Sequence, residues 1–92
     1  EQVLFAHPAI YEAAAVGVPD DDLGEQIKAV VVLKPGQSAS AENIMAFCAE
    51  RLPGFKRPRS VDFTQDLPKN PNGKIVRRLV REPFWAGKER QV

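Results

Sequence analysis

The loop from Leu67 to Lys74 holds the residues of this chain that are best suited to chemistry. Two prolines stiffen its backbone, while Gly73 permits a turn that most residues resist. Lys74 therefore stands on a constrained loop directly before an expected helix. A lysine is a compact cation on a long stem, suited to the negative charge of a phosphate or carboxylate. From the residues alone, a purely structural turn is the commoner explanation of such a loop.

A second basic stretch surrounds Phe55, in the loop Gly54–Pro58, and continues to Arg59. Arg57 and Arg59 carry planar guanidinium groups, which can bind a phosphate through two parallel hydrogen bonds. The simpler interpretation is a solvated basic turn with Phe55 packed into the core. Both interpretations stay open at this point.

The charge is divided unevenly along the chain. Residues 1–50 hold two basic and eight acidic side chains, a net of −6, whereas residues 51–92 hold eleven basic and four acidic side chains, a net of +7. A positive second half indicates an anionic partner. A nucleic acid, a nucleotide cofactor and an acidic protein surface all fit this charge.

The histidine, the cysteine and an acidic run of this chain are each interpreted as structural rather than catalytic or metal-binding. His7 precedes a proline without metal-ligating neighbours, which indicates a surface or capping role. Cys48 falls on an apolar helical stripe and is interpreted as a core thiol rather than a nucleophile. The acidic run Asp20–Asp22 lacks the spacing of a calcium loop, so we expect a solvated turn.

Periodicity predicts three strands. Tyr11–Val18 and Ile27–Leu33 are apolar runs joined by a turn of about eight residues, and both are expected to be buried on two faces. Ser60–Thr64 alternates apolar and polar residues and predicts a third, shorter strand.

Three helices are expected around these strands. Glu1–Ala6 is a short amphipathic stretch, and a middle helix is capped within Ser38–Ser40 and ended by Pro53-Gly54. The last helix is predicted over Ile75–Glu82, with Ile75 and Leu79 facing inward, Val76 and Val80 as further candidates for the inward face, and Pro83 closing the helix. Its three arginines form a basic surface. The sum is a small α+β domain, a three-stranded sheet flanked by helices.

Composition agrees with one small globular domain of 92 residues, of which 43% are hydrophobic and 27% charged. The longest apolar runs, Ala13–Val18 and Ala29–Leu33, are too short to cross a bilayer. One cysteine cannot form an internal disulfide, so a cytoplasmic, reducing setting is expected.

Four stretches in register resemble the adenylate-forming superfamily, which comprises acyl- and aryl-CoA synthetases, peptide-synthetase adenylation domains and luciferases. Pro68-Lys69-x-x-x-Gly73-Lys74 resembles its closing signature motif. The other three stretches are Glu1–Pro8 after the hinge, Val16–Asp20 followed by Gly24-Glu25, and Leu52–Pro58 as the LPxYKxP loop. Together they span residues 1 to about 82.

The resemblance implies a two-step reaction. In such enzymes a carboxylate attacks the α-phosphate of ATP to give an acyl-adenylate, and the CoA thiol then attacks the adenylate. The lysine matching Lys74 contacts the carboxylate and phosphate in the first step, as the catalytic residue. It also resembles the lysine that acetyltransferases modify in many relatives. Mg²⁺ is expected for the full enzyme but not from this chain.

The resemblance also assigns the second basic stretch. In aryl-CoA ligases, an aromatic and two basic residues of this loop meet the nucleotide end of CoA, which implicates Phe55, Arg57 and Arg59. Some relatives stack a tryptophan of the acidic turn on this aromatic, and here that position holds Leu23.

The implied organisation is a mobile C-terminal domain at residues 1–82 with a tail at 83–92. The ATP site and the acyl pocket belong, in the family, to a large N-terminal domain, so this chain alone is expected to be inactive. The expected partners are that domain, a carboxylic acid expected to be a fatty acid, ATP and CoA, with no nucleic acid and no membrane span. The alternative is an autonomous basic module that binds nucleic acid or an acidic protein.

Overall fold

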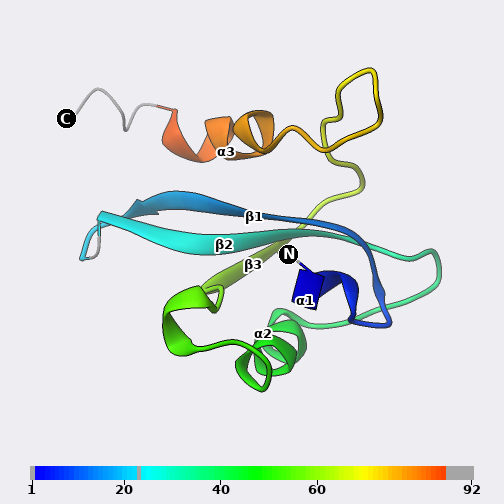
Figure 1. The fold of residues 1–92 in the computed structure, drawn as a ribbon, viewed down its shortest axis with the longest axis horizontal. Helices are drawn as coiled ribbons and strands as arrows, with labels where there is room; N and C mark the ends of the chain where they lie inside the picture. The colour runs from blue at the N-terminus through cyan, green and yellow to red at the C-terminus, as the bar shows by residue number, and fades with distance from the viewer. Residues whose placement is uncertain (1, 23, 87–92) are drawn as a thin grey trace.

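The computed structural model describes residues 2–22 and 24–86, which form three layers with a β sheet in the middle (Figure 1). The strand order is β1-β2-β3, with β1 antiparallel to β2 and β2 parallel to β3. The predicted α+β class is confirmed. In chain order the elements are α1 (Gln2–Phe5), β1 (Ile10–Asp20), β2 (Gly24–Leu33), α2 (Ala41–Ala49), the 3₁₀ turn η1 (Gly54–Lys56), β3 (Ser60–Phe63) and α3 (Arg77–Trp85).

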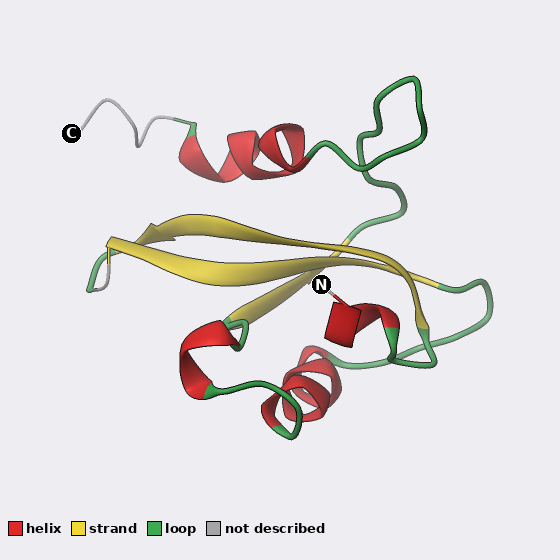
Figure 2. Ribbon diagram, viewed as in Figure 1, coloured by secondary structure: helices red, strands yellow, loops and turns green. Residues whose placement is uncertain are grey.

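The hairpin of β1 and β2 is buried on both faces, as its apolar runs predict. Successive side chains of a strand point to opposite faces. Ala13 and Val31 therefore enter one core, and their neighbours Ala14 and Val30 enter the other. Figure 2 shows α1, α2 and η1 on one side of the sheet and α3 on the other.

Both hairpin strands extend further than predicted, because their pairing continues out to Asp20 opposite Gly24. The predicted end at Val18 followed from the proline at position 19. Pro19 has no N–H to donate, but β1 is an edge strand, where a missing donor can face solvent without breaking the ladder.

The first core lies between the sheet and α2. The helix begins where predicted, because the Ser40 side chain accepts a hydrogen bond from the Asn43 backbone N–H at 3.0 Å. It ends at Ala49, before Leu52. Cys48 is fully buried in this core, and that burial raises the pKa of its thiol, as expected for an inert core cysteine.

His7 is buried rather than on the surface, with 7% of its area exposed. Its Nδ1 accepts the Ala9 backbone N–H at 3.1 Å, and its Nε2 lies 2.7 Å from the Asn43 side-chain oxygen. The ring also contacts Phe47 edge-on at 4.8 Å. The predicted surface position is therefore wrong, because the buried ring connects the turn after α1 to α2, and its Nδ1 accepts a backbone N–H of that turn rather than capping the carbonyls at the end of α1.

The second core lies between the sheet and α3, and this helix differs most from its prediction. It starts at Arg77, not at Ile75, because residues 75 and 76 remain extended: Val76 donates to the Pro68 carbonyl at 2.9 Å. Within the helix, Val80 is buried at 6% exposure, whereas Leu79 is exposed at 40%. The predicted inward position of Leu79 is therefore wrong.

The helix also runs through Pro83 instead of ending before it, so the predicted tail begins too early. A proline inside a helix removes one hydrogen bond and crowds the preceding turn. Two contacts after Pro83 keep the end of the helix against the sheet. Phe84 packs against the second core, and Trp85 Nε1 donates to the Gly17 carbonyl at 2.8 Å. Residues 87–92 of the predicted tail lie outside the described part of the chain.

We predict that Val80→Ala lowers the free energy of unfolding by about 2 kcal/mol, because it leaves a cavity in the second core. Leu79→Ala, the matched control one residue earlier, is expected to cost less than about 1 kcal/mol. Urea denaturation of this chain followed by circular dichroism measures both. A larger loss for Leu79→Ala than for Val80→Ala would contradict the orientation of α3.

Candidate functional site

The loop that presents Lys74 is closed by hydrogen bonds to Asn70. The Asn70 side-chain oxygen accepts the backbone N–H groups of Asn72 at 2.9 Å and of Lys74 at 3.0 Å. The backbone N–H of Asn70 donates to the Lys74 carbonyl at 2.9 Å. Gly73 completes the turn with a φ of +84°, a conformation that favours glycine. The backbone at Lys74 is thus fixed from both sides.

The other lysine of the motif, Lys69, anchors this loop to the sheet. Its ammonium lies 3.0 Å from Glu12 of β1 and 3.0 Å from Asp66, and it donates to the Leu67 carbonyl at 3.2 Å. We call these contacts the Lys69 clamp. Lys69 therefore has a structural role, which leaves Lys74 as the lysine that the loop presents.

The clamp shifts the pKa values of its members in opposite directions. The hydrogen bond from Lys69 holds the pKa of the Asp66 carboxyl below its ordinary value of 3.8. The hydrogen bond to Glu12, followed by that to Asp66, raises the pKa of Lys69 above 10.5. The pair is therefore fully charged across the neutral range, and it is lost in acid as the pH falls through the lowered pKa of Asp66.

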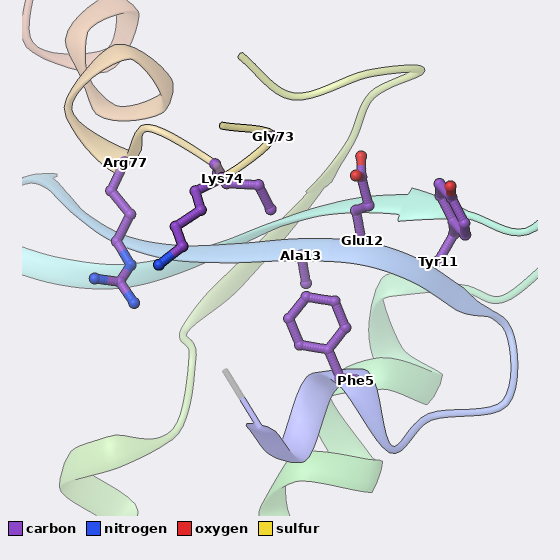
Figure 3. Close-up of a pocket in the computed structure, with 8 residues that line it drawn as sticks. Phe5, Tyr11, Glu12, Ala13, Gly73, Lys74 and Arg77 are labelled. Carbon is purple, nitrogen blue, oxygen red and sulfur yellow. The ribbon is translucent and has the colours of Figure 1, made fainter. Parts of the chain in front are cut away.

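Lys74 lines an open pocket of about 540 Å³ formed by its loop, β1 and α1 (Figure 3). Phe5 and Tyr11 supply apolar surface, and Glu12 and Arg77 supply charge. The Lys74 ammonium is exposed and has no ion pair among residues 2–22 and 24–86. Such a group can neutralise an anion, but a pocket this open needs a second surface to exclude water.

The two arginines of the second basic stretch have different surroundings. Arg59 lines a separate pocket of about 680 Å³ together with Lys28 and the acidic turn Asp20–Asp22. Arg57 instead donates through Nε to the Leu52 carbonyl at 2.7 Å. The side chain of Phe55, like residue 23, lies outside what the structure describes.

The two basic sites lie far apart on the domain. The loop that leads to Lys74 and the acidic turn near Arg59 are at opposite ends of the β1–β2 hairpin (Figure 1). Their two pockets share no lining residue. An anion at Lys74 and an anion at Arg59 would therefore occupy independent sites.

Sequence reasoning missed Glu12 and Asp66 as partners of Lys69, and Asn70 as the residue that shapes the loop. Asn70 had a readable signal, since asparagine often hydrogen-bonds backbone N–H groups that follow it in a turn. Glu12 had none, because its partner Lys69 lies 57 residues away in sequence.

Much of the uneven charge is compensated within the fold. Basic residues of the second half pair with carboxylates, and the pairs that join the two halves of the chain include Arg51 with Glu50 at 3.1 Å, Lys69 with Glu12 at 3.0 Å, and Arg81 with Glu25 at 3.7 Å. Among the described residues, no group of three His, Cys, Asp or Glu side chains is arranged to hold a metal ion. None of the described helices has the length and apolarity needed to traverse a bilayer.

Comparison with known proteins identifies the family. A family model described as the AMP-binding enzyme C-terminal domain matches residues 1–74. A fatty acid–[acyl-carrier-protein] ligase of Streptomyces coeruleorubidus is 42% identical over all 92 residues. A long-chain-fatty-acid–CoA ligase of Bacillus subtilis is 45% identical over 82 residues, or 89% of the chain.

Solved structures give the same result. An acyl-CoA synthetase of Brucella canis superposes on 96% of the chain with a TM-score of 0.88 and 41% identity. The chain spans only a small part of these proteins: 18% of the Streptomyces ligase, 15% of the Bacillus ligase and 17% of the Brucella chain.

We predict that Asp66 titrates below the ordinary aspartate value of 3.8 in the folded chain. In Lys69→Met, which keeps the apolar stem but removes the charge, the midpoint should rise towards that value. Carboxyl chemical shifts recorded by NMR during an acid titration measure both, and Asp62, which pairs with Lys28 instead, serves as the control. An unchanged Asp66 midpoint in Lys69→Met would refute the clamp.

Proposed function

Because the chain belongs to the AMP-binding enzyme C-terminal domain family, we propose that it is the mobile domain of an ATP-dependent acyl-CoA synthetase. Residues 1–82 and the rest of α3 form this domain, and a large N-terminal domain supplies the ATP site and the acyl pocket. The observation that carries the proposal is the exposed Lys74 on a loop braced by Asn70 and the Lys69 clamp. Two relatives are fatty-acid ligases by name, and from these we infer a fatty acid as the substrate.

In the first step, a carboxylate oxygen of the acid attacks the α-phosphorus of ATP. The new oxygen–phosphorus bond forms as the bond to the bridging oxygen breaks, and pyrophosphate leaves with the electron pair. Lys74 approaches the two anions that must meet, and its charge stabilises the transition state without transferring a proton. The domain closes the open pocket by placing it against the large domain, which excludes water.

In the second step, the CoA thiolate attacks the acyl carbonyl and releases AMP. We assign the nucleotide end of CoA to the loop of Phe55, Arg57 and Arg59. Of the two arginines, Arg59 is the one that lines a described pocket, which it shares with Lys28, already paired with Asp62 at 3.0 Å, and with the acidic turn Asp20–Asp22. Arg57 already donates to Leu52 through Nε, and its terminal nitrogens remain for a second phosphate.

Two further assignments follow from the same proposal. The Mg²⁺ that accompanies ATP is held by the large domain and the nucleotide, since the described residues provide no carboxylate cluster for it. A cytoplasmic setting is supported by the buried, unpaired Cys48, because a reducing compartment keeps such a thiol free.

A lysine acetyltransferase is the proposed regulatory partner, and Lys74 is its target. The residue is exposed on a protruding loop, so its ammonium is accessible to a modifying enzyme. Acetylation removes the charge that the first step needs. Lys74→Gln, which resembles acetyl-lysine in size and neutrality, is expected to behave like Lys74→Ala.

We predict that Lys74→Ala in the intact two-domain enzyme slows adenylate formation by about a hundredfold to a thousandfold, as for loss of one preorganised transition-state contact. Thioester formation from supplied acyl-adenylate should change little, because that step does not use Lys74. ATP–pyrophosphate exchange measures the first step, and release of acyl-CoA measures the second.

The control for this pair of assays is Lys34→Ala, which removes an exposed lysine outside the Lys74 pocket. Both half-reactions should keep their rates in this variant. Equal loss of both half-reactions in Lys74→Ala would mean that the residue supports the domain rather than the adenylation step.

We predict that Arg59→Ala raises the KM for CoA about tenfold or more and leaves ATP–pyrophosphate exchange unchanged, because it removes a charge-assisted contact used only in the second step. Arg51→Ala, which removes an arginine that pairs with Glu50 outside this pocket, is the control. A normal KM for CoA in Arg59→Ala would remove the loop from the CoA site.

A further inference from the structure

Two exposed aromatic side chains, which we call the aromatic pair, lie beside Lys74. Phe5 of α1 has 48% of its area exposed and Tyr11 of β1 has 60%, and both line the 540 Å³ pocket of Lys74. Figure 3 shows Phe5 pointing from α1 towards β1 and Tyr11 projecting from the start of that strand. Single exposed hydrophobic residues are ordinary on a protein surface, but aromatic residues that gather at one site are typical of an interface.

The core of the domain does not require the aromatic pair. In α1 the residue before Phe5, Leu4, is buried in the first core, so the helix is anchored while Phe5 faces outward. In β1 the residue before Tyr11, Ile10, is buried in the same core. Polar residues at positions 5 and 11 would therefore leave this core intact, and the two aromatic side chains need an explanation outside folding.

A β-bulge sets the position of Tyr11. Ile10 and Glu12 pair with consecutive residues of β2, so Tyr11 is an extra residue in the ladder. In a regular strand, Ile10 and Ala13 would face opposite sides of the sheet, because side chains alternate, yet both lie in the first core. The extra residue restores their common side and places the Tyr11 ring at the Lys74 pocket. Bulges recur next to active sites, where they redirect a side chain.

We propose that the aromatic pair docks on an apolar surface of the large domain during adenylation and thereby positions Lys74. This inference rests on the proposed function. The chain spans 18% of the Streptomyces ligase and 15% of the Bacillus ligase, so most of each such enzyme lies outside it. The pair shares its pocket with Lys74, and the first step brings that lysine to a site on the large domain. The two rings therefore meet the same surface as Lys74 does.

The docking contact acts in one step only. Covering the two rings removes apolar surface from water, which favours the closed arrangement. Arg59, assigned to the second step, lines a separate pocket that shares no residue with the pocket of the aromatic pair. When the domain turns to present Arg59, the pair leaves the large domain. Its binding energy is therefore available to adenylation and not to thioester formation.

The first test maps exposure in the intact two-domain enzyme by hydroxyl-radical footprinting and mass spectrometry. A fatty acid and α,β-methylene-ATP, whose bridge between the α- and β-phosphates cannot be cleaved, hold the enzyme before the first step. Oxidation of Phe5 and Tyr11 is expected to slow about threefold or more on their addition, as for side chains at the centre of an interface. Phe63 is the control, because it is also exposed but lines a different pocket, and its rate should not change.

The second test uses substitutions in the intact enzyme. Phe5→Ser and Tyr11→Ser are each expected to slow ATP–pyrophosphate exchange about tenfold, as for loss of one anchor of an interface. Tyr11→Phe, which keeps the ring, should restore most of the rate. Phe63→Ser should leave the exchange unchanged. Thioester formation from supplied acyl-adenylate should keep the parent rate in all four variants, which a general loss of folding would not allow.

The inference is overturned if Phe5 and Tyr11 are oxidised at the same rate with and without the ligands, or if Phe63 is protected equally. It is also overturned if the serine variants of the pair adenylate normally and instead change only the oligomeric state or the acetylation of Lys74, since another partner would then use this surface. Lys74→Ala judges the proposed function separately. Normal adenylation in that variant removes the function, whereas impaired adenylation with an unprotected aromatic pair removes only the docking contact.

Discussion

The β1–β2 hairpin must be covered on both faces, and the positions of most other elements follow from this requirement. Its alternating side chains enter two separate cores, and small residues such as Ala14 and Ala29, both fully buried, let helices approach closely. Elements on both sides of the hairpin in sequence, α1 and α2, cover the first face. The second face is covered by α3, which arrives only after the chain has passed β3. The segment with Lys74 is therefore the connection that carries the chain over the sheet edge to its last helix.

The connection that contains Lys74 is held in place on both sides of this lysine. Leu67 is buried in the second core just before the loop, and Val80 is buried in the same core just after it. Between these anchors, Asn70 closes the turn and the Lys69 clamp ties its base to β1. A flexible lysine at the end of this framework can move its ammonium by rotating its own side chain while its backbone stays in place. Rigidity of the loop and reach of the side chain are thus supplied by different residues.

The sequence predicted what depends on local pattern and missed what depends on distant partners. The strands, the Ser40 cap and the double burial of the hairpin follow from periodicity and side-chain chemistry, and all three are confirmed. The end of the last helix was predicted wrongly, because Pro83 is a local stop signal that the contacts of Phe84 and Trp85 with the sheet override.

The candidate site shows the same limit. Lys74 could be selected from its motif, because family resemblance preserves the order of residues along the chain. The partners of Lys69 could not, because Glu12 and Asp66 approach it only after the sheet has formed. The separation of Lys74 from Arg59 was equally hidden, since it depends on the length of the hairpin that divides them. Arg57 and Arg59 are two positions apart in sequence, yet only Arg59 lines the pocket at the acidic turn.

Because Trp85 contacts Gly17, its fluorescence can be used to follow how the last helix packs on the sheet. The chain has one tryptophan, and its indole donates to a β1 carbonyl while Arg81 stacks over the ring at 4.9 Å. The emission of this one fluorophore consequently depends on whether the last helix is seated on the sheet. Since that helix begins three residues after Lys74, an intensity or wavelength change in this chain reports on the anchoring of the lysine loop without any added label.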